Sequence, residues 1–146
     1  MIRKLQEQDI SKVVELEEKM FGETLGEEML KSELSNPLVW FRVIEVNDQV
    51  IGYIGGYFYD GAGEIINFLI DEDYQKKGYG TQLFNSLMNE AKIASIKQIT
   101  LEVKKNNVKG INFYTKNKFK QISIRKHYYK DGEDALVMMK ELIWRY

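Results

Sequence analysis

The sequence predicts a mixed α/β fold, in which an antiparallel sheet contains one parallel pair of strands at its centre. Two runs rich in aromatic and β-branched residues, 39–46 and 50–59, are separated by Asn47-Asp48, which is the pattern of a β-hairpin. A buried strand at 65–70, a helix and another strand at 98–104 then follow one another. A strand–helix–strand path of this length implies a parallel pair with a right-handed crossover. In all, we expect a mixed sheet of about seven strands flanked by about four helices.

The composition is that of an ordinary globular protein, and we expect a single domain spanning residues 1–146. The formal net charge of -1 gives no general attraction to nucleic acid or to an anionic membrane. With no cysteine and one histidine, disulfides and thiolate metal sites are excluded, and we expect no metal. No stretch has the pattern of a signal peptide or a membrane span. A cytoplasmic enzyme or binding module remains.

The first third of the chain predicts two helices joined by a loop. Asp9 suits the N-cap of a helix that runs to about residue 20. After a break at 21–26, a second helix is expected at 27–34 and is stopped by Pro37, the only proline. We expect this helical pair to wall or cap a pocket.

The helix that begins near residue 80 is amphipathic, because its apolar residues recur at helical spacing on one face: Leu83, Phe84, Leu87, Met88 and Ala91. Glycine-containing turns are predicted at 60–63 and 130–132. The remaining elements are expected to be a short first strand at 2–5, a helix at 107–116, a long strand at 119–129 and a closing strand at 135–142.

A glycine loop, Gln75-Lys76-Lys77-Gly78-Tyr79-Gly80, separates the strand at 65–70 from that helix. Its glycines let the backbone approach a ligand and point successive N–H groups outward beside a helix N-terminus, an arrangement that binds phosphate or pyrophosphate. Lys76 and Lys77 add positive charge. Alternatively, the glycines only shape a tight turn, since short glycine motifs often match by chance. The P-loop pattern is absent, and the dinucleotide fingerprint lacks its third glycine, where this chain has Leu83.

Three more residues are candidates for chemistry. Glu102 lies in a strand whose apolar residues face the other way, so it either lines a cleft as a proton acceptor or pairs with a lysine at the sheet edge. Asn107 and Tyr114 share one helix face with Gly110, which suits ligand contact. Alternatively, Asn107 is an N-cap and Tyr114 a half-buried aromatic. Ligands of open α/β sheets bind beyond the carboxyl ends of the strands, where these residues would meet the glycine loop. A base and a phenol beside one phosphorylated ligand favour acyl transfer over redox chemistry.

The pattern Gln75-x-x-Gly78-x-Gly80 resembles the acetyl-coenzyme A loop of the GNAT family of N-acetyltransferases, Gln/Arg-x-x-Gly-x-Gly/Ala. The resemblance covers nearly the whole chain and is carried by LIDEDYQKKGYGTQLF and LEVKKNNVKGINFY. It implies a GNAT-like fold and acetyl-coenzyme A as the acetyl donor. Within the family, LEVKKNNVKGINFYTKNKF and IRKHYYKDGEDALVM are similar to the RimI-type enzymes, which acetylate the N-terminal alanine of a small-subunit ribosomal protein. That similarity implies a protein or peptide N-terminus as the acceptor, with a ribosomal protein among the candidate partners.

The resemblance also implies a role for each site residue. Glu102 would take the proton of the acceptor's α-ammonium group, and Tyr114 would protonate the departing coenzyme A thiolate. Asn107 would hold the pantetheine arm. The implied donor contacts are Phe68, Leu69 and Ile70 for the acetyl-pantetheine arm, and Gln75, Lys76, Lys77, Gly78, Tyr79, Gly80 and Thr81 for the pyrophosphate. A main-chain N–H at a strand bulge near Leu69 would stabilise the oxyanion.

The chain departs from the family pattern at three places. Lys118 stands where these enzymes have glycine before the next strand, so we expect the helix to end differently, through Asn117. The loop at 21–26 lacks the Pro-Trp pair common in these enzymes, and the turn at 130–132 is shorter. Both segments flank the acceptor side. Two alternatives to a peptide acceptor therefore stay open: a small amine such as a polyamine or aminoglycoside, or a non-catalytic module that binds acyl-coenzyme A. The oligomeric state is not predicted.

Overall fold

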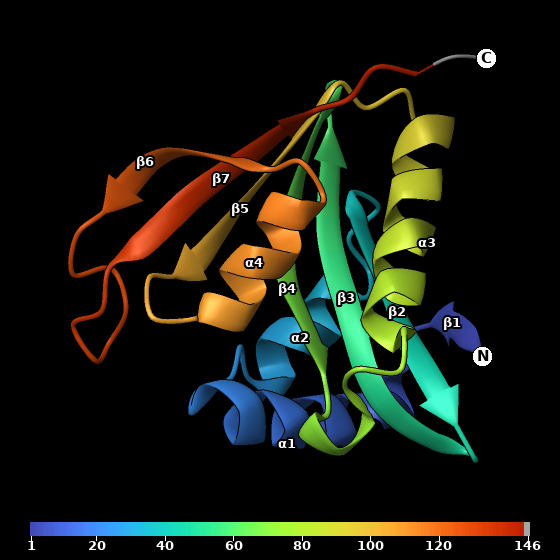
Figure 1. The fold of residues 1–146 in the computed structure, drawn as a ribbon. Coiled ribbons are helices and arrows are strands. Elements are labelled where there is room, and N and C mark those ends of the chain that lie inside the picture. Colours follow the sequence, from blue (N-terminus) through green and yellow to red (C-terminus); the bar gives the residue numbers. More distant parts are fainter. Residues whose placement is uncertain (145–146) are drawn as a thin grey trace.

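The computed structural model describes residues 1–144, which form one seven-stranded sheet with helices on both faces (Figure 1). In sheet order the strands are β1 (Ile2–Lys4), β2 (Val39–Val46), β3 (Gln49–Tyr59), β4 (Ala62–Ile70), β5 (Gln98–Lys104), β7 (Ala135–Glu141) and β6 (Lys120–Arg125). The helices of this part of the chain are α1 (Ile10–Phe21), α2 (Glu27–Glu33), α3 (Tyr79–Ile93) and α4 (Val108–Lys116), with short 3-10 turns η1 (Glu7–Asp9) and η2 (Glu72–Tyr74). Neighbouring strands are antiparallel except β4 and β5, which run parallel. The predicted fold class is confirmed.

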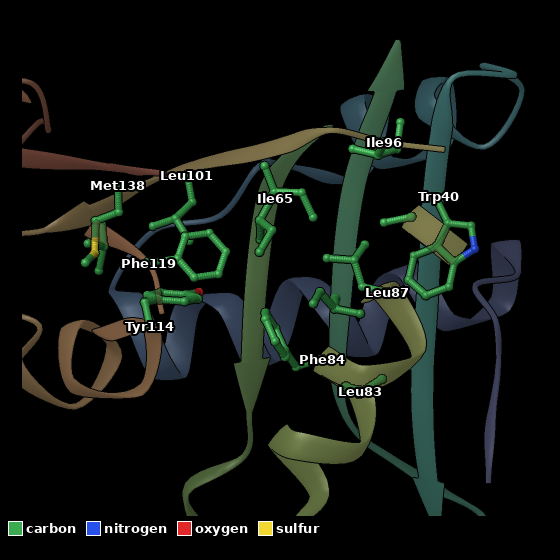
Figure 2. Packing of buried hydrophobic residues seen from close by; sticks show 14 of the residues in the cluster. Trp40, Ile65, Leu83, Phe84, Leu87, Ile96, Leu101, Tyr114, Phe119 and Met138 are labelled. Carbon is green, nitrogen blue, oxygen red and sulfur yellow. The ribbon is translucent and has the colours of Figure 1, made fainter. Parts of the chain in front are cut away.

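The two faces of the sheet bury two separate cores. Helices α3 and α4 cover one face, and α1 and α2 cover the other (Figure 1). The larger core lies under α3 and α4 and includes Ile65, Leu83, Phe84, Leu87, Leu101, Tyr114 and Phe119 (Figure 2). The smaller core lies under α1 and α2 and includes Leu16, Leu30, Val43, Tyr53 and Leu69. Because successive strand residues point to opposite faces, Glu102 lies on the α1/α2 face while its neighbour Leu101 packs in the larger core.

The parallel strands β4 and β5 are paired only over their amino-terminal halves. Pairing between β4 and β5 covers Ala62–Ile65 and Gln98–Leu101, and beyond it the two strands separate toward their carboxyl ends (Figure 1). A register shift between Gly55 and Gly56 leaves Ile66 as the extra residue of a β-bulge in β4. The bulge expected near Leu69 is therefore misplaced: Leu69 pairs regularly with Tyr53, and the irregularity lies at Ile66. Because a bulge bends its strand, β4 turns away from β5 immediately after their last pair.

The predicted end of the strand at 119–129 is wrong, whereas the predicted N-cap residue of the first helix, Asp9, is confirmed. The strand expected at 119–129 ends at Arg125, because His127 has a positive φ of 52° and its N–H donates to Asp134 Oδ1 (2.9 Å), outside the ladder. Asp9 occupies the N-cap position of α1, but its carboxylate makes no bond to the first turn of that helix. Instead it accepts hydrogen bonds from the Gln6 N–H (2.8 Å) and the Arg3 guanidinium (2.7 and 2.9 Å), because η1 runs directly into α1.

The end of α4 shows how the chain manages without the family's glycine. Lys118 itself adopts the left-handed conformation, with φ 73°. Asn117 assists, since both its side-chain Nδ2 (2.8 Å) and its main-chain N–H (3.1 Å) donate to the Phe113 carbonyl. Elsewhere, within residues 1–144, no helix has the length and hydropathy needed to cross a membrane.

Candidate active site

The glycine loop projects beyond the carboxyl end of β4 and leads directly into α3. Lys76 and Gly78 both have positive φ, 63° and 85°, and both are exposed. A Cβ built on Gly78 would meet no protein atom within 4 Å, so this position faces open space. In the described part of the chain no side chain caps α3, whose first intrahelical donor is the Gln82 N–H bonded to the Gly78 carbonyl. The N–H groups of the first turn therefore have no side-chain partner within the described residues, and their binding of an anion stays a prediction.

Gln75 braces this loop against β4. Its Nε2 donates to the Ile70 carbonyl (2.9 Å), so the side chain spans back to the last residue of the strand. Gly80, two residues into α3, would place a Cβ 3.6 Å from both Phe68 and Ile70, which is ordinary van der Waals contact. The start of α3 thus lies against the end of β4, and the structure places Gln75 as a support of the loop rather than among its outward-facing groups.

The edge of β4 that faces β5 exposes unpaired main-chain groups. The Asp71 N–H donates to Ile51 (2.7 Å), and main-chain bonds to β3 alternate along an antiparallel ladder, so Leu69 also directs its groups toward β3. Phe68 and Ile70 therefore direct theirs toward the region where β4 and β5 have separated. Of the three residues predicted to contact a ligand through the main chain, Phe68 and Ile70 have the required orientation. Leu69 does not.

Glu102 lies on the α1/α2 face with a side chain that is 21% exposed. Arg125 Nε lies 3.5 Å from its Oε1, and the interaction of the Tyr128 hydroxyl with the same carboxylate raises the pKa of Tyr128. Burial, followed by the Glu102 charge, raises the pKa of Tyr129 to about 12. The alternative of a lysine partner is wrong: the cation is an arginine, and two tyrosines stand beside the carboxylate. Neither tyrosine was identified from sequence.

Tyr114 lies on the opposite face of the sheet, within the larger core. Its ring packs against those of Phe68, Phe113 and Phe119 at centroid distances of 6.4, 5.7 and 5.6 Å. Burial raises the pKa of the Tyr114 phenol. Figure 2 shows the hydroxyl directed toward β4. Glu102 and Tyr114 thus lie on opposite faces of the sheet, at the region where β4 and β5 are no longer paired.

Asn107 caps α4, since its Oδ1 accepts from the Gly110 N–H (2.9 Å). The alternative reading of Asn107 as an N-cap is confirmed, and among residues 1–144 its Nδ2 has no hydrogen-bond acceptor. Tyr114 is more deeply buried than the half-buried aromatic considered from the sequence, because only 8% of the residue is exposed.

A hollow of about 460 Å³ is lined by Lys104, two residues beyond Glu102 in β5. It is bounded by the α1–α2 loop (residues 22–26) and the β6–β7 turn, and is lined by Phe21, Gly22, Glu23, Thr24, Lys104, Lys130 and Asp131. Lys104 follows Glu102 on the same face of β5, and the charge of Glu23 contributes to the raised pKa of Tyr129, so the hollow adjoins the Glu102 cluster. Sequence reasoning missed Glu23, because a single glutamate in a polar loop carries no spacing signal.

The unpaired strand edge and the amide-rich loop thus lie together at the carboxyl ends of the parallel strands, the place where open α/β sheets bind their ligands. Residues 7–119 match the Acetyltransferase (GNAT) family. The chain belongs to this family and is an N-acetyltransferase that uses acetyl-coenzyme A.

Individual relatives agree with that assignment. A Bacillus subtilis protein with the provisional name ribosomal protein bS18-alanine N-acetyltransferase is 32% identical over 94% of this chain and 92% of its own length. An N-alpha-acetyltransferase of Sulfurisphaera tokodaii is 33% identical over 70% of this chain and 69% of its own. Among solved structures, the ribosomal-protein-S18-alanine N-acetyltransferase of Escherichia coli superposes with a TM-score of 0.89, covering 100% of this chain and 96% of that one at 23% identity.

Gly78→Val tests whether the glycine loop binds the diphosphate. A β-branched residue at φ 85° is strained, and its side chain would fill the open space where the ligand's phosphates would lie. We expect the dissociation constant for coenzyme A, measured by calorimetry, to rise about tenfold or more.

The matched control is Gly61→Val in the β3–β4 turn, where φ is 79° and a Cβ would also meet nothing within 4 Å. It introduces the same strain far from the loop and should leave coenzyme A affinity unchanged. Equal affinity in the parent and Gly78→Val would show that the diphosphate binds elsewhere.

Proposed function

We propose that this enzyme transfers the acetyl group of acetyl-coenzyme A to the N-terminal α-amine of a protein, in the manner of the RimI-type enzymes. The observation that carries the proposal is the position of Glu102. Its half-buried carboxylate lies on β5 just after the last pair with β4, and Lys104, two residues further along β5, lines a hollow walled by two loops. The names of the Bacillus and Sulfurisphaera relatives support this acceptor class, because both refer to alanine or α-amino acetylation.

Main-chain groups would hold the donor along its length. The amides of residues 76–81 would bind the diphosphate at the N-terminus of α3, with Lys76 and Lys77 adding charge. Phe68 and Ile70 would pair with the pantetheine arm as a neighbouring strand does, and Asn107 Nδ2 would contact it from α4. The loop geometry and the unpaired edge fit an elongated, phosphorylated, amide-containing ligand, which is the chemistry of coenzyme A.

Glu102 would accept the proton of the incoming amine. An α-ammonium group has a pKa of about 8, so near neutral pH a carboxylate, directly or through water, suffices to free the nucleophilic lone pair. Arg125 and the Tyr128 hydroxyl fix the carboxylate in place from β6 and the following turn. The amine then attacks the thioester directly, and most of the acceleration comes from holding the two reactants together.

The Phe68 N–H is the donor best placed for the oxyanion that forms on attack. It points into the β4–β5 separation, and in the free enzyme Asn67 Oδ1 accepts from it at 3.0 Å. This moves the expected donor from Leu69 to the residue before it, because Leu69 directs its own N–H toward β3. The oxyanion would displace a side-chain acceptor that already satisfies the Phe68 N–H.

Tyr114 would act on the leaving group from the other face of the sheet. A thiol has a pKa of about 8.5, far below that of a phenol whose pKa burial has raised. Complete proton transfer from Tyr114 to the thiolate is therefore unfavourable in free energy. Tyr114 would instead donate a hydrogen bond to the thiolate. The proton that leaves the ammonium group goes to Glu102, and the sulfur leaves as a thiolate that the Tyr114 hydroxyl stabilises.

The acceptor class is tested with acetyl-coenzyme A and a panel of peptides that differ in their first residue, with polyamines and aminoglycosides in competition. We expect mass spectrometry to locate the acetyl group on the peptide α-amine, with alanine among the best first residues. Transfer only to the small amines, or to no acceptor at all, would overturn the proposal.

Glu102→Gln separates the base from the binding site. We expect turnover near pH 7 to fall about a hundredfold with unchanged affinity for acetyl-coenzyme A. The deficit should shrink as the pH rises above about 8, because the amine then deprotonates without a base. Glu141→Gln is the control, because Glu141 lies in β7 opposite Gln98, at the other end of the β5–β7 pair. A deficit that stays constant with pH would remove Glu102 from the role of base.

Tyr114→Phe tests the hydroxyl on the thiolate side. We expect turnover to fall about tenfold, as for the loss of one charge-assisted hydrogen bond. Because the pKa of Tyr114 is raised, the parent hydroxyl stays protonated, and the ratio of parent to variant should be constant from pH 7 to about 10. A ratio that declines as the pH approaches 10 would contradict this assignment. Tyr59→Phe, at the exposed end of β3, is the control.

A further inference from the structure

A carboxylate is buried outright beneath the α1–α2 loop. Glu17, in α1, is 0% exposed and accepts four hydrogen bonds. Oε1 accepts from the Thr24 hydroxyl (2.6 Å) and the Leu25 N–H (3.3 Å), and Oε2 accepts from the Tyr53 hydroxyl (2.6 Å) and Asn67 Nδ2 (2.7 Å). Within residues 1–144 no lysine or arginine pairs with it. Burying a charge without a counter-ion costs free energy of folding, so we expect this carboxylate to have a functional role.

The two oxygens of Glu17 serve different sides of the proposed site. Oε1 holds the α1–α2 loop, which bounds the hollow, whereas Oε2 holds β3 and β4. In the described chain, the two bonds to Oε1 are the hydrogen bonds that tie residues 23–25 to another element. The loop ends are left-handed glycines, Gly22 (φ 74°) and Gly26 (φ 91°), so its own backbone provides little restraint.

The negative charge also fixes the orientation of Asn67. An ionised carboxylate only accepts hydrogen bonds, so Asn67 must present its NH₂ group to Glu17. The amide oxygen of Asn67 is then directed to the Phe68 N–H, the group at the β4–β5 separation. Burial and the nearby Glu17 charge raise the pKa of Tyr53, which keeps this third partner a donor.

We infer that Glu17 is a positioning residue that sets the α1–α2 loop relative to the thioester end of β4. The inference rests on the proposed function, because it is in that reaction that the loop bounds the acceptor and β4 bounds the donor. Glu17 itself touches neither substrate, since it is fully buried. A purely structural carboxylate would stabilise the protein through all four bonds alike, whereas a positioning carboxylate acts on the acceptor through Oε1.

Glu17→Gln retains the shape of the side chain but places an NH₂ group against hydrogen-bond donors. Its control is Tyr53→Phe, which removes a 2.6 Å hydroxyl bond to the same carboxylate from the core side. We expect Glu17→Gln to raise the acceptor KM about tenfold and to leave the acetyl-coenzyme A KM within about twofold. Tyr53→Phe should lower the unfolding midpoint while the acceptor KM stays within about twofold.

Hydrogen exchange at the Leu25 amide gives a readout that needs no turnover. Exchange should accelerate in Glu17→Gln and in Thr24→Val, and stay at the parent rate in Tyr53→Phe and in Thr24→Ser, which keeps the hydroxyl. Thr24→Val removes the hydroxyl bond to Glu17 (2.6 Å) and the bond that this hydroxyl accepts from the Gly26 N–H (3.1 Å), and it leaves the Glu17 carboxylate in place, so it remains informative if Glu17→Gln does not fold. Thr24→Ser should likewise keep the parent's acceptor KM.

Equal effects of Glu17→Gln and Tyr53→Phe on both KM values, or an unchanged Leu25 exchange rate in Thr24→Val and Glu17→Gln, would overturn the inference and leave Glu17 a structural residue. A parent enzyme that acetylates no acceptor would instead contradict the proposed function. In that case, faster Leu25 exchange in Glu17→Gln alone would still support the placement of the loop by Glu17.

Discussion

The organisation of this enzyme depends on where β4 stops pairing with β5. Pairing ends at Ile65 and Leu101, and the extra residue Ile66 bends β4 away from its neighbour. A strand interior with unpaired N–H and C=O groups must be satisfied by something, since buried main-chain polar groups are costly to leave alone. Asn67 Oδ1 and Gln75 Nε2 each satisfy one such group in the free protein. The same edge can accept a ligand that offers amide groups of its own.

The separation also connects two chemical environments that the sheet otherwise keeps apart. On the α1/α2 face, Glu102 sits among an arginine, two tyrosines and an accessible hollow, which suits a group that must take up and lose protons. On the α3/α4 face, Tyr114 is surrounded by aromatic rings, which suits a group that must stay protonated. In the proposed mechanism, one break in the strand pairing would allow opposite acid–base requirements to be met on two sides of a single thioester.

Much of this could be predicted from the sequence, because the signals were local. Hydrophobic period and turn residues located the β2–β3 hairpin and the crossover from β4 through α3 to β5, and the spacing of Gly78 and Gly80 located the loop. The position of the bulge could not be predicted, since Ile66 is ordinary for a strand and the irregularity appears only in pairing with β3. The strand β6 was predicted too long because the positive φ of His127 ends the pairing with β7, and a histidine side chain gives no sequence signal for that conformation.

Glu17 was missed for a related reason. It lies four residues after Val13 on the buried side of α1, where a glutamate is unusual. Its partners come from three separate parts of the chain, so the sequence around it does not reveal them.

The central claim is that the loop at 76–81 binds a diphosphate while the acetyl group lies between β4 and β5. A crystal structure with acetyl-coenzyme A tests it most directly. We predict the thioester carbonyl within hydrogen-bonding distance of the Phe68 N–H, with Glu102 across the separation. A diphosphate bound away from α3, or a thioester outside the β4–β5 separation, would contradict the account.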